Sequence, residues 1–551
     1  MNNSDSQNIP FRLTIGVTGH RKLENSDAIR KTIRNIANDI LSRFSGTAKT
    51  EVKLCCLSPL AEGADRLVAS EILKYPDTTL KTVLPLTISD YQNDFETSES
   101  KMEFSELLKR SQTPMSLRKK TIAEEYPNEI HSEARSVAYE QVGKFVVQNC
   151  DILIGIWDGK TSQSRGGTAN IIKYAEKENC SRYIVYTDQP DKFKYIDGDK
   201  TTEALFKKVN KFNGEKRFNT FRNSYIKSIY SELFENPIIP EGQRLSPETR
   251  NCIKNHLIPF YVDASTTAKH YQKIYRRTGL AVFWMAFTAM ALVGMGAVFW
   301  RSPPAIFIIE FFILSFITSL LYYADKIKRS HKNWMEYRFL TERIRAAFFL
   351  SVCNIEPTQI NTSRRSTSEG GPEAWMGIVF EEIWNSLPSD NDNKEEDPYL
   401  IKDYIEKAWI DDQISFHDKT CSKNRLISRR LETVGETVFY IAIAAAATHV
   451  IAPVFISWFH NWFVEHTLTL IALTLPTLGA TIESIRSHRA YKHIARSSKQ
   501  MYINLSRLRN TYEIYHPDLL ERYAKEAEQM MLKESEEWLT VMSFSELYKA
   551  V

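Results

Sequence analysis

The amino-acid sequence predicts an α/β domain with a doubly wound parallel sheet, followed by an all-α membrane region with four transmembrane helices in two hairpins. Two observations predict this fold class. Residues 1–190 alternate apolar strands, polar or glycine turns and amphipathic helices, which is the pattern of strand–helix–strand units. Two pairs of long apolar runs follow, at 280–300 and 304–323 and at 437–458 and 466–482, and each pair suits a membrane hairpin.

The first unit opens with an apolar, β-branched strand at 11–17, which ends in a glycine turn at 18–21. Four isoleucines then recur at helical spacing, and they are Ile29, Ile33, Ile36 and Ile40. Further strands are expected at 51–57, 80–86, 150–157 and 181–187, and the charged stretch 96–148 is expected to be largely helical. This succession is typical of a doubly wound sheet.

The first apolar pair runs from Gly279 to Tyr323 and turns at Pro303-Pro304. Each run has about 20 residues, enough for a helix rising 1.5 Å per residue to cross roughly 30 Å of hydrocarbon. The second pair contains His449 and Pro476, which we interpret as a satisfied polar position and a kink. The alternative is that both pairs are buried core helices of a soluble protein, but such helices usually carry a polar stripe.

Basic residues flank the runs on the side to which four crossings return, and only Arg301 lies in the opposite loops. This asymmetry predicts that both termini are cytoplasmic. The flanking residues are Arg276, Arg277, Lys326, Lys328, Arg329, Arg429, Arg430, Arg486 and Arg489.

The second hairpin and the basic helix after it repeat the layout of the first, including Ser-His and Arg-x-Arg elements, which suggests duplication of a two-helix module. We therefore divide the chain into six segments. They are the α/β domain at 1–190, a helical connector at 191–270, the first module at 271–350, a cytoplasmic connector with mobile loops (361–372 and 387–398) at 351–424, the second module at 425–510, and a C-terminal cytoplasmic helix at 511–551.

Composition narrows the possible functions. A net charge of +4 is too small to predict nucleic-acid binding, and no face has a basic track. The seven cysteines show neither C-x-x-C pairs nor zinc spacing, so no metal site is expected and the thiols suit a reducing compartment. The first ten residues lack the pattern of a cleavable signal peptide.

Polar and glycine-rich turns follow three of the predicted strands, and in a parallel sheet they meet at one edge. Glycine turns that open helices bind anions, because the first amides of a helix lack partners and carry partial positive charge. Arginines in the same turns could pair with phosphate oxygens. The alternative is that these arginines form surface ion pairs. The predicted ligand-binding residues are Thr18, Gly19, His20, Arg21, Glu62, Gly63, Ala64, Asp65, Arg66, Asp158, Gly159, Arg165, Gly166, Gly167 and Thr168.

These motifs carry a resemblance. IGVTGHRKL, LSPLAEGADRLVA, VLPL with YQNDF, and CDILIGIWDG followed by RGGTAN resemble a SLOG domain, a Rossmann-like nucleotide-binding family related to the LOG phosphoribohydrolases and the DprA fold. The resemblance covers roughly residues 9–188. The layout of KHYQKIYRR, two crossings and basic helices resembles the SLATT two-helix effector regions found beside SLOG domains in bacterial defence and nucleotide signalling.

The hydrolytic relatives use a P-G-G-x-G-T-x-x-E signature whose glutamate acts on the N-glycosidic bond. Here Ile171 stands three residues after Thr168, so the resemblance implies a sensor in preference to that enzyme. Glu62 and Asp158 are weak alternative candidates for a general base, because both follow strand ends near the glycine turns. The sequence does not decide between a sensor, a membrane-tethered nucleotide or N-glycoside hydrolase, and a membrane scaffold with a vestigial SLOG fold.

The resemblance implies a multi-pass effector in the bacterial inner membrane that assembles as a homo-oligomer and permeabilises the bilayer in anti-phage defence. No cofactor is expected. The implied ligand is a nucleotide-derived second messenger, such as a cyclic nucleotide or an ADP-ribose derivative, made by a separate signalling enzyme. Glu310 is the acidic residue within the apolar runs, and it is a candidate pore-lining or interhelical hydrogen-bonding group. The alternative is that it lies shallow enough to reach the membrane interface.

Overall fold

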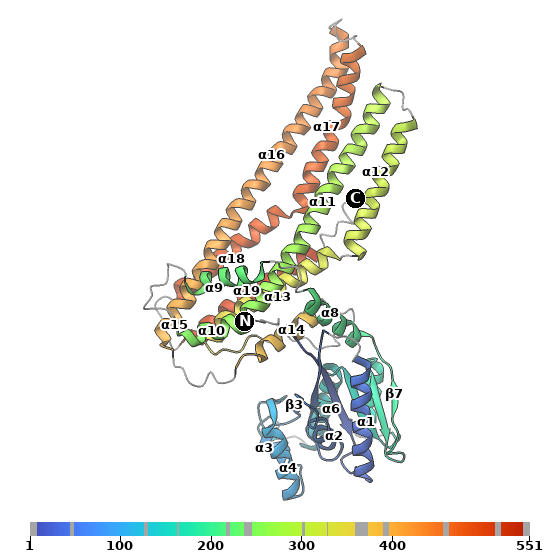
Figure 1. Cartoon of the computed structure of the whole chain (residues 1–551), viewed down its shortest axis with the longest axis vertical. Coiled ribbons are helices and arrows are strands. Elements are labelled where there is room, and N and C mark those ends of the chain that lie inside the picture. The colour runs from blue at the N-terminus through green and yellow to red at the C-terminus, as the bar shows by residue number, and fades with distance from the viewer. Residues whose placement is uncertain are drawn as a thin grey trace. The chain divides into compact units, whose positions relative to one another are not determined.

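The protein is described by a computed structural model that covers residues 8–44, 49–125, 131–161, 165–215, 221–235, 245–299, 304–327, 329–358, 373–388, 396–455, 462–512 and 519–543. The chain forms two compact units (Figure 1). The α/β unit comprises Met1–Lys216 and Ile360–Glu382, and the helical unit comprises Arg217–Gln359 and Ile383–Val551. The predicted mobile loops at 361–372 and 387–398 lie almost entirely outside the described residues.

The α/β unit is built on a seven-stranded sheet in the order β4-β3-β2-β1-β5-β6-β7. The neighbouring strands pair in parallel, apart from β6 and β7, which are antiparallel. The predicted α/β class with a doubly wound sheet is confirmed. The strands are β1 (Phe11–Gly19), β2 (Val52–Ser58), β3 (Thr79–Leu84), β4 (Ser111–Ser116), β5 (Ile152–Trp157), β6 (Arg182–Tyr186) and β7 (Lys194–Ile196).

Helices cover the sheet because its strands are apolar on both faces. The four isoleucines of the first helix are all buried, as their spacing predicts. Helices α6 and α7 pack together with Val146, Leu153 and Ile171 in one core cluster. The helices are α1 (Ser26–Phe44), α2 (Ala64–Ile72), α3 (Ile88–Gln92), α4 (Ser98–Lys109), α5 (Ile122–Glu125), α6 (His131–Asn149), α7 (Thr168–Lys177) and α8 (Thr201–Glu215).

Two strands of the sheet, β4 and β7, were not predicted from the sequence. The stretch 96–148 is not wholly helical, because β4 lies within it at one edge of the sheet. Its sequence, SQTPMS, lacks apolar alternation and contains Pro114, a residue that strands accept mainly at edges. The short strand β7 extends the other edge beyond residue 190.

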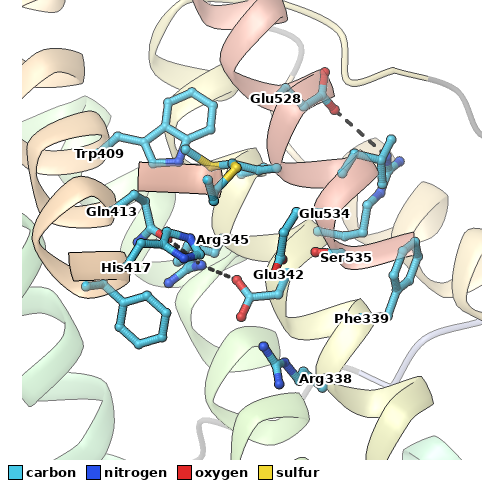
Figure 2. Close-up of a pocket in the computed structure, with 16 residues that line it drawn as sticks. Arg338, Phe339, Glu342, Arg345, Trp409, Gln413, His417, Glu528, Glu534 and Ser535 are labelled. Atoms are coloured by element: carbon cyan, nitrogen blue, oxygen red, sulfur yellow. Dashed lines mark hydrogen bonds and ion pairs between the residues drawn. The ribbon is translucent and has the colours of Figure 1, made fainter. Parts of the chain in front are cut away.

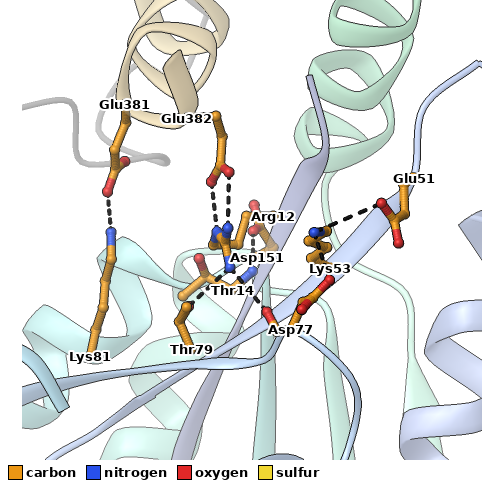
Figure 3. Close-up of polar contacts among 10 residues, drawn as sticks. All are labelled: Arg12, Thr14, Glu51, Lys53, Asp77, Thr79, Lys81, Asp151, Glu381 and Glu382. Atoms are coloured by element: carbon orange, nitrogen blue, oxygen red, sulfur yellow. Dashed lines mark hydrogen bonds and ion pairs between the residues drawn. The ribbon is translucent and has the colours of Figure 1, made fainter. Parts of the chain in front are cut away.

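A segment from between the two hairpins also belongs to the α/β unit. Helix α14 (Glu373–Asn385) places Trp375 against Phe212 of α8, with ring centroids 6.2 Å apart. Arg12, near the start of β1, donates two hydrogen bonds to Glu382, at 2.6 and 2.9 Å, and Lys81 of β3 pairs with Glu381 (Figure 3). Helix α14 is thus held at the amino-terminal ends of the strands.

The helical unit consists of long helices that run alongside one another and shorter helices gathered at one of their ends (Figure 1). Its elements are α9 (Arg222–Phe234), α10 (Pro247–His256), α11 (Ile258–Phe299), α12 (Pro304–Tyr322), the π-helical turn η3 (Tyr323–Ile327), α13 (Ser330–Val352), α15 (Pro398–Tyr404), the π-helical turn η5 (Ile405–Asp411), α16 (Asp412–Phe455), α17 (Trp462–His488), α18 (Tyr491–Tyr512) and α19 (Leu520–Ser543).

Among the described residues, four helices are long and apolar enough to cross a membrane, and they overlap the four predicted runs. Residues 300 and 456–458 of those runs lie outside the described residues. Only 28, 11, 6 and 6% of their most apolar windows are buried inside the protein. Helices of a soluble core would be mostly buried, so this exposure fits lipid contact better than the alternative of buried core helices. The four helices are compatible with a multi-pass membrane protein, although Arg301 and Lys328 lie outside the described residues.

The two hairpins share one arrangement. In the first, α11 and α12 pair and α13 packs back on α11; in the second, α16 and α17 pair and α18 packs back on α16. The hairpins meet along α11 and α17, where a Cβ atom on Gly294 would lie 2.8 Å from Leu473 Cδ2. Gly294 therefore permits a close approach that a larger residue would prevent.

Candidate functional site

A cleft of about 590 Å³ lies at the carboxyl ends of β1 and β5. These strands are neighbours in the sheet, and the strand order reverses between them. Ligands of doubly wound folds bind at such a point, because the loops leave in opposite directions and open a crevice. Nine predicted residues line the cleft: Thr18, Gly19, His20, Arg21, Asp65, Asp158, Gly166, Gly167 and Thr168.

The turn before α2 crosses the end of β1. The amide of Ala64 donates to the carbonyl of His20 at 3.0 Å, and Gly63 has a positive φ of 77° with no space for a Cβ atom beside Arg21. A Cβ atom on Gly19 would lie 2.3 Å from that of Ala64. Gly63 and Ala64 shape the cleft wall from behind and do not line it.

Arg66 points away from the cleft. Its guanidinium donates to the carbonyl oxygens of Leu60 and Ser100, at 3.0 and 2.9 Å, and lies 4.4 Å from the ring centroid of Phe95. The side chain is only 2% exposed. Arg66 therefore anchors the turn to α4. Its guanidinium forms hydrogen bonds with protein groups and does not line the cleft.

The other predicted residues outside the cleft lining have local roles. Glu62 accepts a hydrogen bond from the Ser100 hydroxyl, and Gly159 adopts a positive φ of 80° in the turn after β5. Arg165 is exposed and lies 3.8 Å from Glu133, as the surface ion-pair alternative expects.

The turn Gly166-Gly167-Thr168 opens α7 inside the cleft. Gly167 is the N-cap and supplies no side-chain cap, so the first amides of α7 remain directed at the cleft. Gly166 lies against α6, where a Cβ atom would be 2.7 Å from Tyr139 Cβ. Arg21 lies above the Tyr139 ring, 5.1 Å from its centroid. These groups supply partial and full positive charge for an anion.

A polar floor faces the same cleft. Asp65 is 6% exposed and accepts a hydrogen bond from the Ala61 amide at 3.3 Å. Burial raises the pKa of Asp65 to about 7, although the Ala61 amide, Arg21 and Arg66 oppose this rise. Tyr91 is fully buried, and burial raises the pKa of its hydroxyl well above the usual range. Tyr91 is therefore uncharged at neutral pH, and Asp65 is partly uncharged.

His20 and Asp158 meet at the mouth of the cleft. Nε2 of His20 lies 3.2 Å from both the Asp158 amide nitrogen and its Oδ1. Nε2 accepts from the amide in one tautomer and donates to the carboxylate in the other, so these contacts alternate. A hydrogen bond from the Lys160 amide lowers the pKa of Asp158. Asp158 therefore stays ionised at neutral pH, which is unfavourable for a proton donor.

Tyr91, Tyr139, Trp157 and Lys160 line the cleft but were not predicted from the sequence. Tyr139 lies within a helix that covers the sheet, and Tyr91 lies in α3 after β3, inside the YQNDF motif. Because this motif is part of the resemblance, Tyr91 could have been predicted as a cleft residue from the sequence. Ile171 occupies the position of the hydrolase glutamate. It is buried against Gly143 and lines the cleft with an apolar side chain.

Among the described residues, no group of three or more His, Cys, Asp or Glu side chains could hold a metal ion. A second cavity, in the helical unit, is lined by charged and aromatic groups that include Arg345, Glu342 and Trp409 (Figure 2). Its volume is about 40 Å³, which holds a few water molecules. A nucleotide does not fit there. The cleft of the α/β unit is larger and collects most of the predicted ligand-binding residues, so it is the candidate site.

Glu310 lies on the face of α12 that contacts α11. Ile306, one turn earlier, is the residue that a Cβ atom on Gly296 of α11 would meet, at 2.4 Å. Ile313, Ile317 and Leu321 continue that face and pack with α11 residues. Glu310 is therefore in an interhelical position. His449, in contrast, shares a hydrogen bond with the Thr469 hydroxyl at 3.0 Å, as a satisfied polar residue would.

No protein family, curated protein or solved structure matches the chain. The Rossmann-like class therefore rests on the strand order and direction alone.

Proposed function

We propose that the α/β unit binds a phosphate-containing, nucleotide-derived ligand and that the membrane helices are its output. The observation that carries this proposal is the cleft at the strand-order reversal, which is lined by the Gly167 turn, Arg21 and a buried polar floor. A helix N-terminus and an arginine together favour a phosphate, because both stabilise negative charge without a metal.

The connectivity of the chain supports communication between the cleft and the membrane helices. Strand β1 carries the cleft residues Thr18 and Gly19 at one end and Arg12 at the other. Arg12 holds Glu382 of α14 (Figure 3), and α14 lies in the sequence between the two hairpins. A ligand that changes the position of β1 or the stability of this contact would therefore act on the connection between the hairpins.

We further propose that ligand binding reorganises a homo-oligomer that permeabilises the bacterial inner membrane, with both termini cytoplasmic. The basic residues at the helix ends support this orientation, and the SLOG and SLATT resemblance supports the role in anti-phage defence. The experiment is dye leakage from liposomes containing the full chain, measured with a panel of cyclic nucleotides and ADP-ribose derivatives. Leakage should require one of these ligands and should disappear in Gly167→Glu, which places a carboxylate at the anion site.

Leakage that is independent of every nucleotide and survives Gly167→Glu would contradict the sensing role. A chain that shows neither leakage nor any thermal shift with the panel would favour the membrane scaffold. Gly435→Ala is the matched control, since a Cβ atom on Gly435 meets nothing within 4 Å.

A second candidate function is a membrane-tethered nucleotide or N-glycoside hydrolase. It is favoured by Asp65, a buried carboxyl group in the cleft whose pKa is about 7, since a general acid or base works best near the ambient pH. Glu62 and Asp158 are weaker candidates for a general base, because Glu62 is engaged by Ser100 and the lowered pKa of Asp158 makes its carboxylate a weak proton acceptor. Product formation from the nucleotide panel, lost in Asp65→Asn, would identify the enzyme; tight binding without turnover would exclude it.

A further inference from the structure

The hydroxyl group of Tyr91 is the buried polar group in the cleft that most needs a partner. Tyr91 is 0% exposed, lines the cleft, and its hydroxyl forms no hydrogen bond with any described residue. Its ring is held by edge contacts with Phe95 and Phe104, at 5.1 and 5.7 Å between centroids. A buried hydroxyl without a partner destabilises a fold, so the site retains a group that a ligand could satisfy.

Asp65 lies on the same floor and has spare acceptor capacity. Its one hydrogen bond from a described residue comes from the Ala61 amide to Oδ2, whereas a carboxylate offers about four acceptor positions. A carboxyl group repels phosphate and accepts hydrogen bonds from hydroxyl groups. The Asp65 and Tyr91 end of the cleft therefore suits an uncharged, hydroxyl-bearing part of a ligand.

This floor is continuous with the anion end. Tyr139 lies next to both: Gly166 packs on its Cβ atom, and its ring centroid is 6.1 Å from that of Tyr91. The Tyr139 hydroxyl is already bound by Asp94, so Tyr139 forms a side wall shared by both ends and leaves Tyr91 as the hydrogen-bonding group. Arg21 stands over the same ring.

We propose that Asp65 and Tyr91 form a sugar subsite that binds the hydroxyl groups of a ribose whose phosphate lies at the Gly166-Gly167-Thr168 turn. This inference rests on the proposed function, because it assumes the anion site. The carboxylate of Asp65 accepts a hydrogen bond from one hydroxyl, and the Tyr91 hydroxyl pairs with its neighbour. The ligand is then a ribonucleotide-type phosphate in preference to a deoxyribose phosphate.

The test uses the full chain in detergent micelles with three probes, inorganic phosphate, ribose 5-phosphate and 2-deoxyribose 5-phosphate, and measures each dissociation constant by titration calorimetry. The wild type should bind ribose 5-phosphate at least about tenfold more tightly than 2-deoxyribose 5-phosphate. Tyr91→Phe and Asp65→Asn should reduce this ratio to less than about twofold. Tyr75→Phe, whose hydroxyl bonds lie elsewhere, on Arg34 and Asn38, should keep it.

Tyr91→Phe also controls for folding. Because the wild-type hydroxyl has no described partner, the variant should melt at or above the wild-type temperature while losing discrimination. Equal binding of both sugar phosphates by the wild type, or a ratio unchanged in Tyr91→Phe, would overturn the sugar subsite and leave the anion site standing. If the wild type binds none of the three probes, the proposed phosphate site fails, and the sugar subsite fails with it.

Discussion

The hydroxyl of Tyr275 shares a hydrogen bond with Nδ1 of His488 at 3.2 Å. The Tyr275 ring also stacks on His331, with centroids 4.4 Å apart. His331 and His488 occupy equivalent places in the two modules, within Arg-Ser-His at 329–331 and 486–488. The repeated motif thus brings one histidine from each hairpin to a single tyrosine of α11, which lies just before the apolar run of that helix.

We predict that this cluster makes the helical unit sensitive to acid. Both histidines lie beyond the apolar runs, and burial lowers the pKa of each to about 4. Arg489, His331 and Arg276 lower that of His488 further, and Asp325 partly opposes the shift at His331. Both rings are neutral when folded, so stability present above pH 6.5 should fall as the pH drops towards 4.

The measurement is the melting temperature of the full chain in detergent at pH values between 7.5 and 4.5, with unfolding monitored by the circular dichroism signal of the helices. The double variant His331→Gln with His488→Gln should show a smaller loss over this range than the wild type. An identical pH profile in both proteins would show that other groups control acid stability.

Gly279→Ala should destabilise the contact between the two hairpins. A Cβ atom at this position would lie 2.2 Å from Nε2 of His488, and overpacking of a filled interior costs about 1 to 3 kcal/mol. Gly435→Ala is the matched control, because that position is open and alanine favours a helix by up to about 1 kcal/mol. Thermal unfolding should move in opposite directions in the two variants, and a shared direction would contradict the packing.

Arg12→Ala should release α14 from the sheet. The side chains of Arg12 and Glu382 are 16 and 6% exposed, and removing one partner of such a pair costs about 3 kcal/mol. Hydrogen exchange of residues 373–385 should then become about a hundredfold faster. Lys81→Ala is the control, since its pair with Glu381 is more exposed and is worth about 1 kcal/mol or less.

The same Arg12→Ala variant tests the route from cleft to membrane. Ligand binding should persist, because Arg12 lies at the opposite end of β1 from the cleft, whereas ligand-dependent leakage should weaken. Leakage that is unchanged in a protein whose α14 exchanges rapidly would exclude α14 from the coupling.

Glu310→Gln should change the ion selectivity of any conductance without removing the ligand requirement. Glu310 lies on the α11-facing side of α12, and an ionisable group inside a membrane bundle acts on permeating ions or on a neighbouring helix. Planar bilayer recordings with asymmetric salt would measure the reversal potential in both proteins. An unchanged reversal potential would assign Glu310 to helix pairing alone.

Several features could be predicted from the sequence because they depend on local pattern. The apolar runs of about 20 residues indicate membrane helices from length alone, and the spacing from Ile29 to Ile40 indicates a buried helical face. The glycine turns indicate where the strands end, and parallel strands must bring such turns to one edge. Fold class and the position of the cleft were therefore within reach of the sequence.

Other features depend on contacts between residues distant in the chain. Arg66 and Asp65 are neighbours in sequence, yet the fold turns Arg66 into the protein and leaves Asp65 on the cleft floor. The edge strand β4 and the docking of α14 on β1 have no periodic signal, because their partners lie elsewhere in the chain. The sequence by itself determined the four candidate membrane helices, the sheet and its turn-bearing edge, through local periodicity and length. Only the tertiary structure decided which side chains face the cleft, because that depends on packing partners that local patterns do not specify.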